Sequence, residues 1–457
     1  MPLSTDGVLA DDQNGGEKIS VTTPVSSSPV EPPRHSVTSL LAPLKVHNFC
    51  LLLGGQTVSN LGDVFYAVAL PWLVLTRGNG AQELGLVLGA YGISRICTTA
   101  LGGMLSDRLG PRRIMLFADV TRALLVAFLT VLVFWRGYLP LWQLCAITIP
   151  LGAFTGLFWP ANYAIMPKLL PDDALQSGNA INISLRQLTS LVGFGIAGVV
   201  ISRLQLGTAL TVDVFSFVVS AITLAFMRSE RKASFADLPF VPPPFPMKGE
   251  PSTEEESAST DQSSMTFWQL VKSSHLFQLA LLLVAITGLT FDGMMQVALP
   301  TLAHGAFATG ASGYGVMLAA FSGGALVGGV IAGSLGHLRR RSIVALVLLL
   351  LEAGAVTCVP FTGGVLGAAL ALAGAGFTNG LAGILLLTLV QQLLPRHLQG
   401  RIMAAIILAN DGLYPLSVVL AGAVTTRWGA MAMFPLTGIA ILIAAIFGLL
   451  QRESREV

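Results

Sequence analysis

Long apolar runs, separated by short polar segments, cover most of the chain. A membrane-spanning helix needs about 20 predominantly apolar residues, and twelve runs are close to this length. They lie near 49–75, 84–105, 114–135, 140–163, 181–203, 208–227, 276–302, 314–336, 342–361, 364–390, 402–425 and 431–450. The pattern predicts an all-α membrane protein with twelve transmembrane helices.

Two longer polar segments divide the chain. Residues 1–46 are rich in Ser, Pro and Asp and lack the apolar core of a signal peptide, and residues 229–272 contain "VPPPFP" and "STEEES". Such segments have too little apolar surface to form a core. We expect a disordered cytoplasmic tail at 1–46, a six-helix bundle at 47–228, a cytoplasmic linker at 229–272, a second six-helix bundle at 273–451 and a short tail at 452–457.

Basic residues in the short loops predict the orientation, because lysine and arginine are enriched in cytoplasmic loops. Loops on one side hold nine of them and loops on the other side hold four. The larger set is Arg108, Arg112, Arg113, Lys168, Arg339, Arg340, Arg341, Arg396 and Arg401; the smaller set is Arg77, Arg136, Arg203 and Arg427. We expect the larger set, the linker and both termini in the cytoplasm.

The two halves of the chain are related in sequence. "VSNLGDVFYAVALP" at 58–71 and "TGLTFDGMMQVALP" at 287–300 each place an aspartate eight residues before the proline of "ALP". "LGLVLGAYG" at 84–92 likewise corresponds to "YGVMLAAFS" at 314–322, and Gly152 and Gly156 correspond to Gly376 and Gly380. Parallel repeats of this kind are related by an axis along the membrane normal and form a site between them. The duplication therefore indicates a transporter built from two pseudo-symmetric bundles.

Composition supports the membrane assignment and limits other functions. The 457 residues are 53% hydrophobic and 11% charged, against about 25% charged in soluble domains. The mean hydropathy is +0.73. A net charge of +2 gives no reason to expect a nucleic-acid partner, and the four cysteines lack metal-ligand spacing. We expect a monomer in the lipid bilayer with no metal and no cofactor.

One loop carries a recognisable motif. "GMLSDRLGPRRIML" at 103–116 resembles the loop motif of the major facilitator superfamily, through Gly103, Asp107, Arg108, Gly110, Arg112 and Arg113. The stretches "FCLLLGGQTVSNLGD", "FADVTRALL", "FWPANYAIMPKLLP" and "GNAINISLRQL" resemble the branch that contains macrolide efflux proteins and the enterobactin exporter. The resemblance implies the major facilitator fold, with the motif as a gate latch in which Asp107 accepts bonds from Arg112 or Arg113. Gly103 is expected to allow close helix packing, and Gly110 a tight turn.

Charged residues within the apolar runs are the candidate functional residues, because a charge at the bilayer centre costs about 2.5–3.5 kcal/mol on insertion scales. Asp63 and Asp292 lie about 15 residues into their spans, roughly 22 Å along a helix. The resemblance implies that these spans line a central cavity. Because desolvation disfavours an ionised carboxylate, we expect Asp63 and Asp292 to couple proton movement to transport. The other intramembrane charges are Arg95, Asp119, Arg122, Arg186, Asp213, Glu352 and Asp411.

The arginines within the spans are all in the first half, whereas Asp292, Glu352 and Asp411 lie in the second. An isolated buried charge is costly, so we expect Arg95 or another first-half cation to lie close to Asp411 in one state. We expect Asp119 and Arg122 to pair locally, Arg186 to belong to a gate pair, and Asp213 to be a solvated residue near a helix end.

The expected cavity wall is mostly apolar and aromatic, with Gln56, Asn60, Tyr66, Phe154, Trp159, Asn162, Met295 and Asn379 as candidate substrate contacts. Such a wall suits bulky lipophilic ligands. The sequence thus predicts proton-coupled efflux of small amphipathic compounds, such as drugs, macrolides or siderophore-like molecules. Import of a nutrient or lipid by the same fold is the alternative. A membrane-embedded enzyme is a remote one, since the histidines lie in the tail, in loops or at span ends.

Overall fold

The computed structural model describes residues 42–76, 80–137, 139–227, 275–334, 341–393, 406 and 408–451, and the described elements are helical. In chain order they are η1 (Ala42–Lys45), α2 (His47–Thr76), α3 (Gly80–Leu109), α4 (Pro111–Arg136), α5 (Leu141–Leu169), α6 (Asp172–Arg203), α7 (Leu206–Phe226), α10 (His275–Gly293), η2 (Met294–Ala298), α11 (Leu299–His304), α12 (Gly310–Ser334), α13 (Arg341–Cys358), η3 (Val359–Phe361), α14 (Val365–Leu393), α16 (Tyr414–Trp428) and α17 (Ala430–Leu450).

The predicted all-α membrane fold is confirmed. Within the described residues, eleven helical stretches are long and apolar enough to cross a membrane. The remaining predicted span, 402–425, is represented by α16, and its beginning falls outside the described residues. The predicted span at 181–203 lies within α6, which starts at Asp172, directly after Pro171. Only Leu170 and Pro171 separate α6 from the end of α5.

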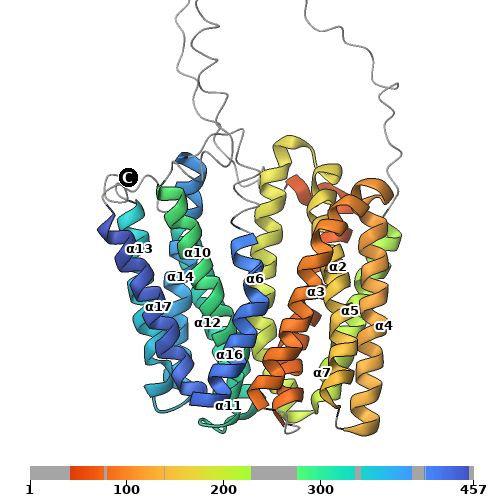
Figure 1. Cartoon of the computed structure of the whole chain (residues 1–457). Coiled ribbons are helices and arrows are strands. Elements are labelled where there is room, and N and C mark those ends of the chain that lie inside the picture. Colours follow the sequence, from red (N-terminus) through yellow and green to blue (C-terminus); the bar gives the residue numbers. More distant parts are fainter. Residues whose placement is uncertain are drawn as a thin grey trace, which may run out of the picture.

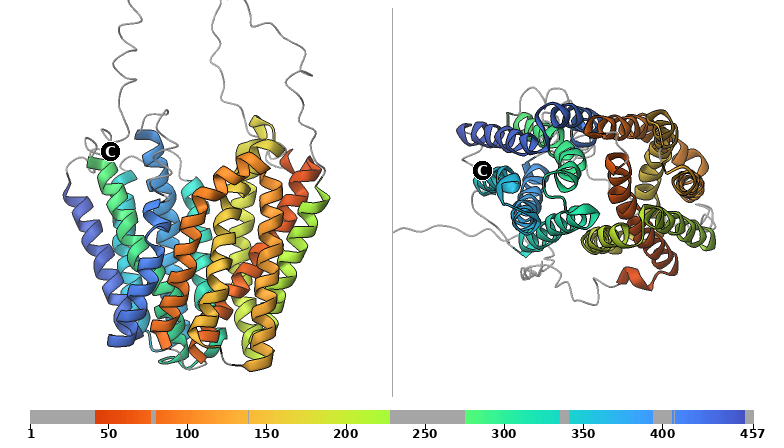
Figure 2. Two further views of the ribbon diagram at one scale, coloured as in Figure 1. Left: turned by 45° about the vertical axis from the view of Figure 1, so that its right-hand side comes forward. Right: turned by 90° about the horizontal axis from the view of Figure 1, so that it is seen from below.

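The helices form two groups, α2–α7 and α10–α17, which stand side by side in the two side views (Figures 1 and 2). We call the end that carries Arg108, Arg112 and Lys168 the basic end. The opposite end, which carries Trp72, His304 and Trp428, is called the closed end because the two groups meet there. At the closed end the Trp72 and His304 rings pack edge to face, with centroids 5.2 Å apart.

Glycines set the close approach of helices inside each half. Gly152 and Gly156 of α5 lie against the backbone of Tyr91 and Arg95 on α3. Their repeat partners, Gly376 and Gly380 of α14, lie against the α12 backbone. The same close helix contact is thus present in both halves.

A second set of glycines joins the two halves at the closed end. A Cβ atom at Gly85 of α3 would lie 3.1 Å from the Gly422 Cα of α16, and one at Gly315 of α12 would lie 2.9 Å from the Gly198 Cα of α6. Gly85 and Gly315 are repeat equivalents, as are Gly198 and Gly422 at the same offset as the α5 and α14 glycines. Two pseudo-symmetric backbone contacts therefore seal this end.

The predicted disordered tail ends earlier than expected. Ala42–Lys45 form a short 3-10 turn that contacts α2 and α6, so residues 42–46 belong to the packed structure. Residues 1–41, 228–274 and 452–457, on which the tail and linker predictions fall, lie outside the described residues.

The contact between the halves at the closed end requires glycines, which have no side chain, and this requirement can be tested at Gly198. Gly198→Val places a branched side chain against Gly315, and we expect the two halves to separate there. Spin labels at exposed Leu204 and Phe361, in a cysteine-free background, should report a longer distance. The matched control is Gly195→Val on the same helix, where a Cβ meets its nearest atom only at 3.9 Å. Equal distances in both variants would contradict the packing argument.

Candidate functional site

A cavity with two lobes lies between the halves. One lobe, of about 220 Å³, is lined by α2, α3, α5 and α16; the other, of about 250 Å³, is lined by α2, α6, α10, η2 and α12. Ala67 and Gln296 line both lobes, so the lobes are neighbours that share this part of their wall. Asp63 lines the first lobe and Asp292 the second. The repeated aspartates thus line neighbouring spaces between the halves.

In the first lobe, Asp63 is held by a buried arginine. Arg122 Nη2 donates to Asp63 Oδ1 at 2.6 Å, and Arg122 Nη1 donates to Asp119 Oδ1 at 3.3 Å. Asp119 also accepts a 2.6 Å bond from Ser220 Oγ. The guanidinium lies 4.1 Å from the centroid of the Phe217 ring, which shields it from solvent. The predicted Asp119–Arg122 pair is present, and it also includes Asp63.

Burial differs strongly within this cluster. The side chains of Arg122 and Asp119 are 4% and 0% exposed, whereas that of Asp63 is 42% exposed. Arg122 and Asp119 are therefore a structural centre of the first half, while Asp63 reaches into the cavity from the same network. The Asp63 carboxylate can therefore exchange a proton with solvent while the buried Arg122–Asp119 pair stays intact.

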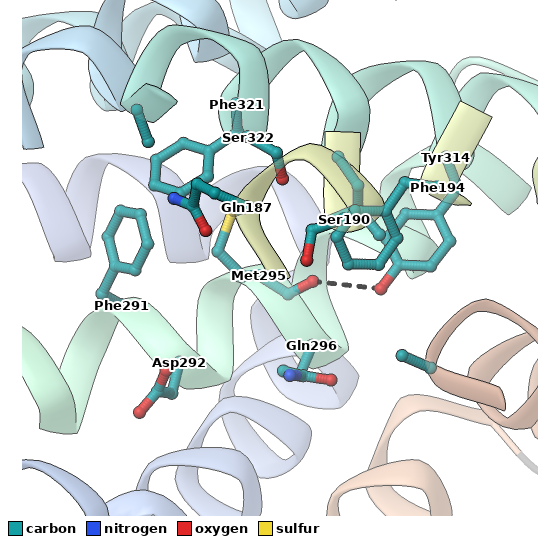
Figure 3. Close-up of a pocket in the computed structure, with 13 residues that line it drawn as sticks. Gln187, Ser190, Phe194, Phe291, Asp292, Met295, Gln296, Tyr314, Phe321 and Ser322 are labelled. Atoms are coloured by element: carbon teal, nitrogen blue, oxygen red, sulfur yellow. Dashed lines mark hydrogen bonds between the residues drawn. The ribbon is translucent and has the colours of Figure 1, made fainter. Parts of the chain in front are cut away.

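In the second lobe, Asp292 lies near the end of α10, one turn before Gln296 (Figure 3). Directly after this helix, Met294–Ala298 form a π-helical segment, a type of local widening that often occurs at functional sites. Two bonds fix the segment: Ser417 Oγ accepts the Gly293 N–H at 2.8 Å, and Tyr314 donates to the Met295 carbonyl at 3.4 Å. Asp292 itself makes no hydrogen bond or ion pair within the described part of the chain.

Asp63 and Asp292 have different neighbours, and the sequence explains this difference. The repeat position of Arg122 is Glu352, so the cation that holds Asp63 is replaced by an acid in the second half. Glu352 is buried and accepts a 2.9 Å bond from Asn379 Nδ2. Asn379, a predicted cavity residue, instead contributes to the core of its own half. Asp292 thus has no bonded cation in the described part of the chain, and its carboxylate points away from the ring of Phe291 (Figure 3).

The predicted bond between the halves at Asp411 is present. Arg95 Nη2 lies 2.8 Å from Asp411 Oδ2, and the Arg95 guanidinium lies 5.9 Å from the centroid of the Tyr414 ring. This pair ends the α3–α16 contact that begins at Gly85 and Gly422. With side chains 25% and 45% exposed, it is a partly solvated bond at the boundary between the sealed end and the cavity.

The motif residues at the basic end are arranged differently from the expected latch. Arg112 donates to the carbonyls of Leu224 and Ala225 at 2.7 and 2.6 Å, and so caps the end of α7. Asp107 is exposed and makes no side-chain bond among the described residues, so the expected bond to Arg112 or Arg113 is absent. Arg108 and Arg113 are exposed as well.

The motif glycines have separate outcomes. The prediction for Gly110 is confirmed: it has a φ of +89° before Pro111, the first residue of α4. The prediction for Gly103 is wrong, since no atom of a neighbouring helix lies within 4 Å of a Cβ placed there. Gly102 has that role instead, with the Leu157 Cα 2.8 Å from such a Cβ.

The Major Facilitator Superfamily model matches residues 52–414. The chain belongs to this superfamily. Its curated relatives in the superfamily include multidrug efflux pump Tap of Mycolicibacterium fortuitum, 25% identical over 89% of this chain and 96% of Tap. Macrolide efflux protein A of Streptococcus pyogenes is 24% identical over 39% of this chain, and an uncharacterized transporter of Bacillus subtilis, YfiS, is 23% identical over 41%. Each of these two shorter matches spans only 44% of the relative.

Solved structures share the superfamily fold. A bacterial homologue of the human lysosomal transporter Spinster, inward-facing and occupied, has a TM-score of 0.64 with 13% identity, over 90% of this chain and 98% of that one. The nucleoside transporter NupG has a TM-score of 0.59 with 13% identity, over 87% and 99%. With the family match, these folds identify a multi-pass membrane transporter rather than an enzyme.

The remaining predicted residues of this superfamily member fall into two groups. Tyr66, Trp159 and Met295 line the cavity. Gln56 and Asn162 are buried, Asn60 is half-buried, and Phe154 packs on Phe117 at 5.5 Å; none of these lines either lobe. The prediction for Arg186 is not met here: its guanidinium stacks on Trp159 at 5.4 Å within the same half, and it has no described carboxylate partner.

Several lining residues escaped the sequence reasoning. Tyr91, Tyr414, Gln187 and Ser190 line the lobes although they lie on helices that also form the seal between the halves. Their helical spacing could have indicated this, since Tyr91 and Arg95 are four residues apart on one face. Which face of a long apolar helix meets the cavity is decided by its neighbours.

The burial difference between the two ion pairs gives a stability prediction. Arg122→Gln leaves Asp119 buried without its cation, at a cost of about 3–5 kcal/mol for breaking a buried pair. Arg95→Gln breaks a partly exposed pair, typically worth about 0.2–1 kcal/mol. We expect the melting temperature of purified protein to fall clearly more in Arg122→Gln than in the matched Arg95→Gln variant. Equal losses would contradict the burial argument.

We expect the Arg95–Asp411 pair to affect the balance between states, because it joins the two halves. Because a partly exposed pair contributes about 0.2–1 kcal/mol, Asp411→Asn should raise the population open at the closed end by about 5-fold at most. Spin labels at the exposed residues Trp135 and Trp428, in opposite halves at that end, measure the distance distribution. Distributions identical to those of the wild type, with and without transported dye, would remove Asp411 from the gate.

Proposed function

We propose that this transporter exports small amphipathic compounds and that protons moving through the cavity drive the export. The observation that carries the proposal is the central cavity with Asp63 in one lobe and Asp292 in the other, one carboxylate held by a cation and one without. The names of Tap and macrolide efflux protein A support export of drug-like molecules.

Cavity size and lining favour a ligand that fills both lobes. Drug-sized pockets typically measure about 300–1,000 Å³, and each lobe is smaller, at about 220 and 250 Å³. A bulky ligand would therefore extend past Gln296 from the tyrosine-rich first lobe to the phenylalanine-rich second lobe. It would contact both carboxylates, and aromatic rings with a few polar groups suit an amphipathic molecule.

The charge arrangement suggests different roles for the two acids. Asp63 keeps Arg122 as a partner, so its release or uptake of a proton changes a defined ion pair. Asp292 has no such partner among the described residues, and a positively charged group on the ligand can replace the missing cation. Substrate and proton would then compete for the same cavity, which is a simple basis for exchange of one for the other.

Orientation and domain limits are part of the proposal. We place the basic end in the cytoplasm, because basic loops are cytoplasmic, and the limits of the two bundles at 47–228 and 273–451. The closed end then faces outward, and the described arrangement is the state in which the outer side is sealed. The absence of a bond between Asp107 and Arg112 or Arg113 among the described residues fits this state, since a latch at the basic end should be broken when that end is open.

Import of a nutrient or lipid is the second candidate function, and one observation favours it. Exporters that the sequence resembles often carry a Gly-Pro pair on the fifth helix, whereas "LVGFGIAGVV" at 191–200 of α6 has glycines and no proline. The direction of dye movement in cells decides between the two functions. Export lowers the cellular dye content, and a protonophore abolishes this decrease. Import raises the cellular dye content.

The coupling prediction is tested in proteoliposomes with an imposed proton gradient and a lipophilic cationic dye. The wild type should accumulate dye only while the gradient lasts. Asp63→Asn should bind dye and lose gradient-driven accumulation, while Asp292→Asn should bind dye more weakly. Glu83→Gln, an acid outside both lobes, is the control. Gradient-driven accumulation in Asp63→Asn at the wild-type rate would remove Asp63 from proton coupling.

A further inference from the structure

A third carboxyl lies in the first half, outside the cavity and outside the bonded cluster. Asp213 of α7 is 1% exposed, so it is not the solvated residue near a helix end that the sequence suggested. Neither of its carboxyl oxygens accepts a bond of hydrogen-bond geometry among the described residues. The Ser216 hydroxyl lies beside the carboxyl, but it donates to the backbone carbonyl of Asp213, at 2.7 Å. A buried carboxyl whose neighbouring hydroxyl is already bonded to the backbone needs an explanation.

The position of Asp213 is created by a glycine in the neighbouring helix. A Cβ atom at Gly62 would lie 2.6 Å from Asp213 Oδ1, so α7 can place its carboxyl here only because position 62 has no side chain. Gly62 directly precedes Asp63 in the chain. The carboxyl of Asp213 is thereby brought next to the helix turn that carries the cavity aspartate.

The titratable groups around Asp213 come from two helices. Asp63 and Tyr66 belong to α2, and Asp119 and Arg122 belong to α4. Arg122 binds Asp63 and Asp119 through its two terminal nitrogens, while its Nε has no acceptor. The Tyr66 hydroxyl is also buried without a partner. The cluster therefore holds three carboxyls, one guanidinium and an unused donor on that guanidinium.

Charge balance fixes the number of protons that this cluster needs. Three ionised carboxylates and one guanidinium would leave two uncompensated negative charges in a low-dielectric interior, which is costly. Asp63 and Asp119 have the cation, and Asp63 is also partly solvated. Asp213 has no bonded cation among the described residues and no solvent, so it is the member that must be neutral while Arg122 is bound to Asp63.

We propose that Asp213 is an internal proton store. Asp213 gives its proton to Asp63 and takes over the Arg122 guanidinium from it. In this exchange the proton leaves the Asp213 carboxyl and binds the Asp63 carboxylate, and the Arg122 guanidinium moves from Asp63 to the newly ionised Asp213. The total charge of the cluster is the same before and after. Asp63 can thus become neutral on the cavity side while Arg122 keeps two carboxylate partners. The proposal rests on proton coupling at Asp63.

The test measures the protonated carboxyl directly, without transport. Infrared spectra of wild-type protein in lipid nanodiscs at neutral pH should contain a protonated-carboxyl C=O band that Asp213→Asn lacks. Ser216→Ala keeps the carboxyl and should keep the band. Asp63→Asn should also lose it, because Arg122 is then free to pair with an ionised Asp213.

The infrared spectra test the proton store at Asp213 and the exchange of Arg122 separately. The store is overturned if the difference spectrum, wild type minus Asp213→Asn, contains no protonated-carboxyl band. A band that is lost in Asp213→Asn and persists in Asp63→Asn overturns the exchange of Arg122. If Asp213→Asn does not fold, Asp63→Asn still decides, since persistence of its band contradicts the proposal. Loss of the band in both, together with normal gradient-driven transport by Asp63→Asn, would retain the store and refute coupling at Asp63.

Discussion

The buried guanidinium of Arg122 organises the first half of this transporter. It binds a fully buried carboxylate, Asp119, on its own helix and a partly exposed one, Asp63, on α2, and it rests on the Phe217 ring of α7. Three helices are therefore positioned by one cation. Because a buried charge without partners is so costly, the group persists only while those contacts are intact, and Asp63 is held at the cavity wall as a result.

The described part of the second half has no buried arginine of this kind, and the two sides of the cavity therefore differ in charge. At the repeat position of Arg122 the chain has Glu352, which is bonded to Asn379 within its own bundle. Asp292 thus occupies the same place as Asp63 without a cation beside it. Reversal of one charge between the repeats thus gives the two cavity acids different surroundings.

Close backbone contacts complete the arrangement. Glycines hold α5 on α3 and α14 on α12 inside the halves, and the pairs Gly85–Gly422 and Gly198–Gly315 join the halves at the closed end. Such contacts have little side-chain freedom and are either made or broken, which suits a rigid rocking motion. The Arg95–Asp411 pair lies where this seal ends, so an electrostatic bond and a steric contact join the halves next to each other.

The sequence by itself determined the class of fold, the duplication and the identity of the charged residues. Apolar length, repeated motifs and the cost of charge in a membrane are local properties, so Asp63, Asp292 and the Arg95–Asp411 bond could be predicted. The sequence could not assign faces on helices that are apolar all round. Only the tertiary structure showed that Asn379 and Phe154 face inside their own bundles, that Arg112 caps α7, and that Asp213 is buried beside Gly62. These outcomes depend on which helix lies opposite, and packing between distant segments decides this.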